Sequence, residues 1–259
     1  MNLTIGSAAS RARAWLSGAA DLLLPPACAA CGGAEAIEDR LCRPCAVELL
    51  SLVARPYCRR CGATVGPNIP DRDDGCSACP DPLPRFEAAV RLGPYAGPLR
   101  QIIRRWKYRR MEAMRGRLGR MLAQAVASRC AQARLDVVVP VPMHWWRRIR
   151  RGYDHALAIA GALAGELRLP LGRELVRVRD TRPQIELSRS RRAENVRGAF
   201  AAASPASLAG ACVLLVDDVT TTGATANEAA RTLLSAGASS VVLAVLAKAE
   251  PPRAYATRW

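Results

Sequence analysis

Apolar residues in this chain fall into short continuous runs that alternate with longer amphipathic stretches. The runs have the length of buried β-strands, which we expect at residues 90–92, 136–141, 175–178, 211–216 and 241–247. In the stretches between them, apolar positions recur every three or four residues, which predicts helices at 98–106, 111–125, 153–167 and 223–234. This alternation predicts an α/β fold with a parallel sheet covered by helices on both faces.

Two segments do not fit the alternation. Residues 180–197 are polar and arginine-rich without a sustained period, which predicts a long loop. Residues 10–23 predict a short helix that packs on another part of the protein. They do not resemble a signal peptide, because Arg11 and Arg13 come too late and Asp21 interrupts the apolar stretch. No apolar run approaches the roughly 18 residues of a membrane helix, so we expect a cytoplasmic protein.

Charge and cysteine are distributed unevenly, which divides the chain of 259 residues. Residues 28–84 hold eight of the ten cysteines and a net charge of −2. Residues 85–259 have a net charge of +17, so they account for the positive net charge of the whole chain, which is +16. A proline-rich stretch at 79–84 separates them and is typical of a linker. We therefore expect an N-terminal packing helix in residues 1–27, a cysteine-rich unit in 28–84 and an α/β domain in 85–259.

The cysteine-rich unit contains four successive CxxC pairs. Two such pairs bring four thiolates around one tetrahedral Zn²⁺ ion, and glycine after the second cysteine allows the tight turn that this needs. The pattern predicts a double zinc ribbon with one site at Cys28, Cys31, Cys42 and Cys45 and the other at Cys58, Cys61, Cys76 and Cys79. With all four positions filled by protein, each zinc is structural.

Two alternatives remain for these cysteines. A cross-braced pairing of the four CxxC pairs has the same spacing, and redox-active or plain structural cysteines are a second reading. Four pairs in a row favour zinc, because redox-active CxxC motifs do not usually come in fours. Cys130 and Cys212 lie in apolar stretches, and we expect both to be ordinary buried cysteines.

The sharpest motif follows the apolar run at 213–216. Two carboxylates, Asp217 and Asp218, lead into a hydroxyl-rich turn that opens a helix. Free backbone N–H groups and the positive end of the helix dipole make such a turn a phosphate cradle. Adjacent carboxylates can accept hydrogen bonds from a sugar diol or hold Mg²⁺ through water. A strand end followed by a capped helix without any ligand is the plainer alternative, but paired aspartates there are costly without a partner.

This stretch resembles the phosphoribosyl pyrophosphate (PRPP) motif of type I phosphoribosyltransferases. The resemblance implies that Asp217 and Asp218 contact the ribose 2′ and 3′ hydroxyls. It implies that the 5′-phosphate binds to the residues of the following turn and helix start, which are Thr220, Thr221, Thr222, Gly223, Ala224 and Thr225. In purine salvage enzymes a carboxylate within this loop assists the base, and here Thr221 takes that place.

Further segments, together with the zinc ribbon, resemble ComF-type proteins, and the resemblance covers nearly the whole chain. These segments are residues 106–108, 139–144, 151–156, 179–184, 187–189 and 192–200. One departure is Asp154-His155, where Asn-Gln is more usual. Because ComF-type proteins are associated with natural competence, the uptake of DNA as single strands, the resemblance implies a link to DNA uptake and its proteins.

If the chain is a phosphoribosyltransferase, two arginine-rich segments would neutralise the pyrophosphate leaving group together with Mg²⁺. The loop at 142–152 contributes Arg147 and Arg151, and the segment at 180–197 would be a flexible lid that contributes Arg192. The reaction would be displacement at ribose C1 through an oxocarbenium-like transition state, for which the protein positions substrates and neutralises charge. No residue identifies the acceptor, so a non-catalytic PRPP-binding protein is also compatible with the sequence.

The basic segments favour a rival function, a DNA-uptake accessory protein that binds single-stranded DNA and uses the fold as a scaffold. Residues 100–120 hold nine Lys and Arg against one Glu, interleaved with Trp106 and Tyr108, and Trp145-Trp146 is followed by two arginines. Such surfaces bind single strands through phosphate contacts and base stacking. Trp106 also fits an apolar helix face. The zinc ribbon could additionally dock a partner protein. The two histidines, at 144 and 155, are expected to be packed or capping residues rather than acids or bases.

Overall fold

The computed structural model describes residues 27–33, 40–66, 75–109, 112–146, 149, 152–181, 189–203 and 208–250. The helix expected at residues 10–23 lies outside these ranges. Among the described residues, no helix combines the length and the apolar character needed to cross a membrane.

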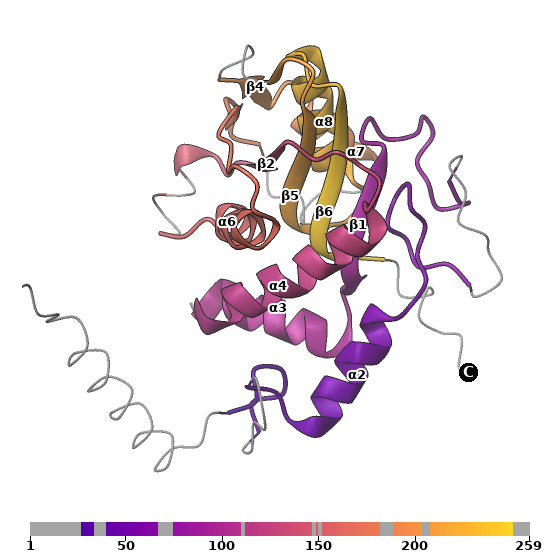
Figure 1. Ribbon diagram of the computed structural model, residues 1–259, viewed down its shortest axis with the longest axis vertical. Coiled ribbons are helices and arrows are strands. Elements are labelled where there is room, and N and C mark those ends of the chain that lie inside the picture. Colours follow the sequence, from indigo (N-terminus) through magenta and orange to yellow (C-terminus); the bar gives the residue numbers. More distant parts are fainter. Residues whose placement is uncertain are drawn as a thin grey trace, which may run out of the picture.

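A four-stranded parallel sheet forms the centre of the protein (Figure 1). Its strands lie in the order β1 (Ala88–Pro94), β6 (Ser240–Lys248), β5 (Cys212–Thr220) and β2 (Val137–Pro140). Every neighbouring pair is parallel. The strands are almost continuously buried because helices cover both faces, which confirms the parallel α/β architecture.

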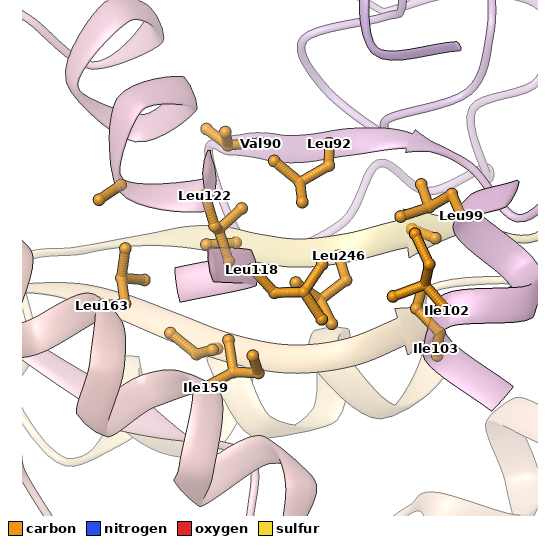
Figure 2. Close-up of a cluster of buried hydrophobic side chains, with 14 of the residues drawn as sticks. Val90, Leu92, Leu99, Ile102, Ile103, Leu118, Leu122, Ile159, Leu163 and Leu246 are labelled. Carbon is orange, nitrogen blue, oxygen red and sulfur yellow. The ribbon is translucent and has the colours of Figure 1, made fainter. Parts of the chain in front are cut away.

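Alternate strand residues build two separate cores. On one face, Val90, Leu92 and Leu246 meet the helices α3 (Gly97–Arg109), α4 (Glu112–Arg129) and α6 (His155–Leu167) (Figure 2). On the other face, Leu215 and Leu243 meet the helix α8 (Ala224–Ser235). This alternation is the two-residue period of a strand, and it explains why the strands read as continuous apolar runs.

The segment between α6 and β5 differs from expectation in two ways. The strand expected at 175–178 forms as β3 (Leu175–Arg177), but it pairs antiparallel with β4 (Phe200–Ala202) outside the central sheet. Val176 and Val178 are exposed, so this small sheet buries only one face. The loop expected at 180–197 contains a helix, α7 (Arg189–Val196), which packs against α8. The loop prediction was therefore wrong for these eight residues.

The N-terminal cysteine-rich part shares a core with the α/β part. The helix α2 (Arg43–Val53) packs against α3 (Figure 1). Leu49 and Leu52 of α2, together with Cys28, belong to the same buried cluster as the residues of α3 and α4. Apolar burial thus continues from the first cysteine group into the main core.

A buried ion pair joins the second cysteine group to both ends of the α/β part. Arg91 of β1 and Glu250 after β6 lie 3.0 Å apart, with side chains 0% and 4% exposed. Arg91 also donates to the Thr64 hydroxyl at 2.8 Å, and the Thr64 amide donates to Glu250. The Arg91 guanidinium lies over the ring of Tyr57, with 4.9 Å between its carbon and the ring centroid. Four segments therefore meet at one charged contact.

Candidate functional site

Eight cysteines gather into the two groups that the sequence predicts. In each group the four Sγ atoms lie within 4.8 Å of one another, and the groups are Cys28, Cys31, Cys42, Cys45 and Cys58, Cys61, Cys76, Cys79. This arrangement confirms the consecutive pairing and contradicts a cross-braced one. Gly32 and Gly62, which follow the second cysteine of two CxxC pairs, have φ angles of 81° and 73°. This left-handed conformation is the one for which the sequence uses glycine.

The sulfur spacing fits zinc. Zn–S bonds of about 2.3 Å in a tetrahedron place sulfurs about 3.8 Å apart. The structure has 3.8 Å for Cys31 and Cys42, and 3.7 Å for Cys58 and Cys79. All four corners are protein ligands, so the donor set is that of a structural site without an open position.

Backbone donors further prepare the first group for a metal. Burial raises the pKa of the Cys28 thiol, but N–H groups including that of Cys42 outweigh burial and lower the pKa to about 6. A thiol that ionises readily is a ready metal ligand. By contrast, Cys130 and Cys212 lie outside both groups and are half-buried rather than buried, with Cys212 accepting from the Ser240 hydroxyl at 2.9 Å. The sequence-based expectation that both would be buried was therefore only partly correct, because each is partly exposed.

The paired carboxylates lie at the carboxyl edge of the central sheet. Strand β5 runs on to Thr220, so Asp217 and Asp218 lie within the last residues of the strand rather than after it. Both are half-buried, and Asp217 accepts from the Asp218 backbone N–H at 2.8 Å. Burial and the Asp218 charge raise the pKa of Asp217 to about 7, although Lys107 and Arg177 oppose that rise.

The turn after β5 offers unpaired donors beside these carboxylates. Gly223 has a φ of 83° and is the N-cap of α8, and the Ala224 amide donates to the Thr222 hydroxyl at 3.3 Å. Within the described part of the chain, the amides of Thr221, Thr222 and Gly223 donate no hydrogen bond. A run of free amides at the start of a 12-residue helix is a typical anion-binding arrangement. Thr220 is buried, and Thr225 stands in the first turn of α8.

Two cations that the sequence did not assign to the site face these carboxylates. Lys107, near the end of α3, places its Nζ 2.6 Å from Asp218 Oδ2. Arg177 of β3 contributes a positive charge to the environment of Asp217. The sequence marked Lys107 as part of a basic segment and of a ComF-like segment but gave it no role at this site, because its contact with Asp218 spans more than a hundred residues. No local signal could have identified the pair.

The expected pyrophosphate residues are only partly placed. Arg147 and Arg151 lie outside the described residues. Arg192 lies on α7 and is half-exposed, so this part of the segment expected as a flexible lid is helical. Nearby, Arg179 donates to the carbonyl oxygens of Asn195 at 2.9 Å and Arg197 at 2.6 Å, which connects the end of α7 back toward β3.

The site suits Mg²⁺ only together with a ligand. Asp217 and Asp218 are two carboxylates, and the described residues provide a group of three or more metal ligands only at the two cysteine groups. Mg²⁺ usually binds one or two carboxylates together with substrate phosphates and water. The aspartates therefore fit a Mg²⁺ ion that arrives with a phosphorylated ligand.

Trp106 and His155 are packing residues. Trp106 is 1% exposed and belongs to the core, so it cannot stack on a DNA base and that part of the basic-surface hypothesis was wrong. His155 is also buried, with its ring centroid 4.7 Å from that of Trp106. Asp154 caps α6 by accepting from the Leu157 amide at 3.1 Å. The unusual Asp154-His155 pair thus builds the start of α6, as expected for a packed histidine.

Comparisons with known proteins agree with this architecture. The family model for a double zinc ribbon domain matches residues 19–84, and that for a phosphoribosyl transferase domain matches residues 153–258. A similar solved structure is a glutamine PRPP amidotransferase from B. subtilis in complex with ADP and GMP. It is 28% identical, with a TM-score of 0.36 over 51% of this chain and 26% of that chain.

Curated relatives match across most of the chain. The DNA utilization protein YhgH of Salmonella typhi is 32% identical over 206 residues, which are 78% of this chain and 87% of the relative. YhgH of Escherichia coli is 34% identical over 170 residues, 64% of this chain and 74% of the relative. Competence protein F of Haemophilus influenzae is 32% identical over 223 residues, 84% of this chain and 94% of the relative. The chain therefore belongs to the competence protein F (ComF) family, with a double zinc ribbon followed by a phosphoribosyltransferase-type domain.

Proposed function

We propose that this protein binds PRPP or a related sugar phosphate at the carboxyl edge of its sheet and acts in DNA uptake or utilisation. One observation carries the proposal: two adjacent carboxylates on the interior strand β5 lie directly before a turn at the start of α8, where three amides donate no hydrogen bond to any described residue. Ligands of open α/β sheets bind at this edge. The phosphoribosyl transferase match over residues 153–258 includes both features.

The two halves of the site would take different parts of the ligand. The amides and hydroxyls of Thr221–Gly223 would hold the 5′-phosphate, while Asp217 and Asp218 would accept hydrogen bonds from the ribose hydroxyls. Mg²⁺ bound with the ligand would neutralise the pyrophosphate. If phosphoribosyl transfer follows, the protein's own contribution is to hold the ribose and the leaving group in line and to exclude water.

The role in DNA uptake rests on the relatives. The names of competence protein F and of the DNA utilization proteins YhgH refer to competence and to DNA utilisation, and each matches this chain at 32–34% identity. The sugar-phosphate site would then belong to the handling of imported DNA or of the nucleotides derived from it.

Replacing both carboxylates is expected to weaken PRPP binding. The asparagine side chains of Asp217→Asn/Asp218→Asn are uncharged, so they cannot replace the two carboxylates as charged acceptors. Hydrogen bonds to charged groups contribute about 1.5–3 kcal/mol each. We expect calorimetry with Mg²⁺ to show saturable PRPP binding to the wild type and an affinity lower by about tenfold or more in the variant. Glu166→Gln is the matched control, because Glu166 is an exposed carboxylate on α6. Unchanged affinity in the double variant would contradict this role for the carboxylates, and a wild type that binds no PRPP would overturn the proposed function.

Single-stranded DNA binding is a second candidate, favoured by a separate observation. Trp145 and Trp146 are 62% and 53% exposed, with ring centroids 5.8 Å apart. Large exposed aromatic rings on a chain of net charge +16 are suited to stacking on unpaired bases.

Removing these rings is expected to weaken binding of a single-stranded oligonucleotide. Stacking contributes about 1–3 kcal/mol per base, so Trp145→Ala/Trp146→Ala should lose about tenfold or more in fluorescence anisotropy titrations. Binding should also fall steeply as salt rises. Leu50→Ala is the control, since Leu50 is 64% exposed but is not aromatic. Equal affinities for the wild type and the tryptophan variant would exclude this surface.

A further inference from the structure

Three consecutive side chains of α3 contact three different parts of the protein. Arg105 Nη1 donates to the carbonyl oxygen of Cys28 at 3.0 Å. Trp106 packs against the start of α6, and Lys107 pairs with Asp218. The end of α3 therefore lies between the first cysteine group and the candidate sugar-phosphate site.

Arg105 is fitted closely to the first cysteine group. Its guanidinium occupies the space beside Gly32, where a Cβ atom would lie 2.5 Å from Arg105 Nη2. The Gly32 amide also donates to the Cys28 carbonyl at 2.8 Å. Since Cys28 and Cys31 are predicted zinc ligands on either side of this turn, metal binding would fix the oxygen that receives Arg105.

Trp106 fixes the rotation of the helix end. Its ring centroid lies 4.7 Å from that of His155 and 6.1 Å from that of Tyr153, and both ring pairs meet edge to face. Edge-to-face pairs are a favoured arrangement for aromatic rings. A fully buried ring of this size leaves α3 little freedom to turn, so the direction of the next side chain, Lys107, is set by the core.

Lys107 supplies a cation where two carboxylates crowd together. Its side chain is 26% exposed and that of Asp218 is 19% exposed, so water screens the pair only in part. The charged groups facing Asp217 are Asp218 on its own strand, Lys107 on α3 and Arg177 on β3. Two adjacent carboxylates that lose one of these cations hold a proton more tightly.

We propose that Lys107 is a positioning residue of the sugar-phosphate site, holding the Asp218 side chain in place, and that Arg105 and the first cysteine group hold Lys107 there. The inference rests on the proposed PRPP site. It gives the zinc ribbon a second role, because the ribbon would set the geometry of ligand binding in addition to stabilising the fold.

The first test replaces Lys107 and varies the pH. Lys107→Met should bind PRPP with Mg²⁺ about tenfold or more weakly at pH 7 in calorimetry, because a charged hydrogen-bond partner is lost. Its affinity should recover relative to the wild type as the pH rises, because Asp217, whose pKa is raised, then ionises without the lysine. Lys107→Arg keeps the charge and should restore most of the affinity. A loss that is equal at every pH, or that Lys107→Arg does not relieve, would overturn the inference.

The second test asks whether Arg105 acts through Lys107. Arg105→Ala should lower PRPP affinity by about threefold in the wild type and have no measurable effect in Lys107→Met, which is the signature of coupled residues. Zinc content, measured on the same samples, should stay at two ions per chain. Equal effects of Arg105→Ala in both backgrounds would show that Arg105 does not act through Lys107.

A ligand-free measurement separates this inference from the proposed function. The carboxyl ¹³C resonance of Asp217 should titrate at higher pH in Lys107→Met than in the wild type, because Lys107 lowers the pKa of Asp217. If it does and the wild type binds no PRPP, the proposed function fails while the lysine–carboxylate link stands. If the wild type binds PRPP and Asp217 titrates identically in both proteins, the inference fails and the proposed function stands.

Discussion

Removal of zinc by a strong chelator is expected to unfold the double zinc ribbon. In the described part of the chain, the buried cluster of the second cysteine group consists of Cys58, Cys61 and Ala63, so little apolar core supports this group there. So small a cluster cannot offset the conformational entropy of ordering the segment. Structural zinc supplies about 10–16 kcal/mol of apparent binding free energy in comparable units. We expect two zinc ions per chain, and loss of hydrogen-exchange protection over residues 40–66 once they are removed.

Cysteine substitutions make this prediction specific. Cys61→Ser should lower the zinc content to one ion per chain, whereas Cys130→Ser and Cys212→Ser should leave it at two, because these cysteines lie outside both groups. Loss at the first group should also disturb α2 and α3, since Cys28 shares their core. A metal-free protein with unchanged protection over residues 40–66 would refute the assignment.

Replacing Arg91 with methionine is expected to destabilise the whole protein by about 3–5 kcal/mol, the usual cost of leaving one partner of a buried ion pair alone. Glu250 would lose its guanidinium partner at a position where its side chain is 4% exposed. Thr64 would lose the donor to its hydroxyl. Urea unfolding followed by tryptophan fluorescence measures the change.

Two further variants test whether the ion pair itself is responsible. Arg91→Met/Glu250→Gln should cost less than the sum of the two single substitutions, because neither charge is then left unpaired. Arg134→Met is the surface control: Arg134 pairs with Asp136 at 3.0 Å but is 90% exposed, and its loss should not change the unfolding midpoint measurably. Equal destabilisation by Arg91→Met and Arg134→Met would contradict a stabilising role for the buried Arg91–Glu250 ion pair.

The sequence predicted those features that depend on local patterns. The CxxC spacing identified the eight cysteines and the apolar runs located the strands of the central sheet. The spacing alone left a cross-braced pairing open, and the folded arrangement of the sulfurs decides against it. The ends of these strands were less certain, because β5 continues through the polar residues Asp217 and Asp218 to Thr220. Their backbone pairs with β6 whatever their side chains are, so hydropathy alone stops the strand too early.

Features that depend on distant contacts could not be predicted. Helix α7 was missed because its residues are mostly polar, with Val196 as a buried apolar residue at its end. Such a segment has no repeating spacing of apolar residues that would indicate a helix. Strand β3 was placed in the wrong sheet, since its three residues cannot indicate their partner. Trp106 fitted both a core and a DNA surface, and only the packing of α6 against α3 decides between them.

The contact between Arg91 and Glu250 also constrains the order of events during synthesis. The two residues are separated by 159 positions, so the ribosome needs roughly 8–32 s to reach Glu250 after Arg91, at about 5–20 residues per second. Strand β6, which pairs with both β1 and β5, emerges in the same final portion. The nascent zinc ribbon can therefore bind its metal early and pack its first cysteine group on α3, but the second group reaches its Glu250 contact only after the last strand has left the exit tunnel. A chain released before Glu250 would lack that contact, and without β6 the strand β1 would have no neighbour in the sheet.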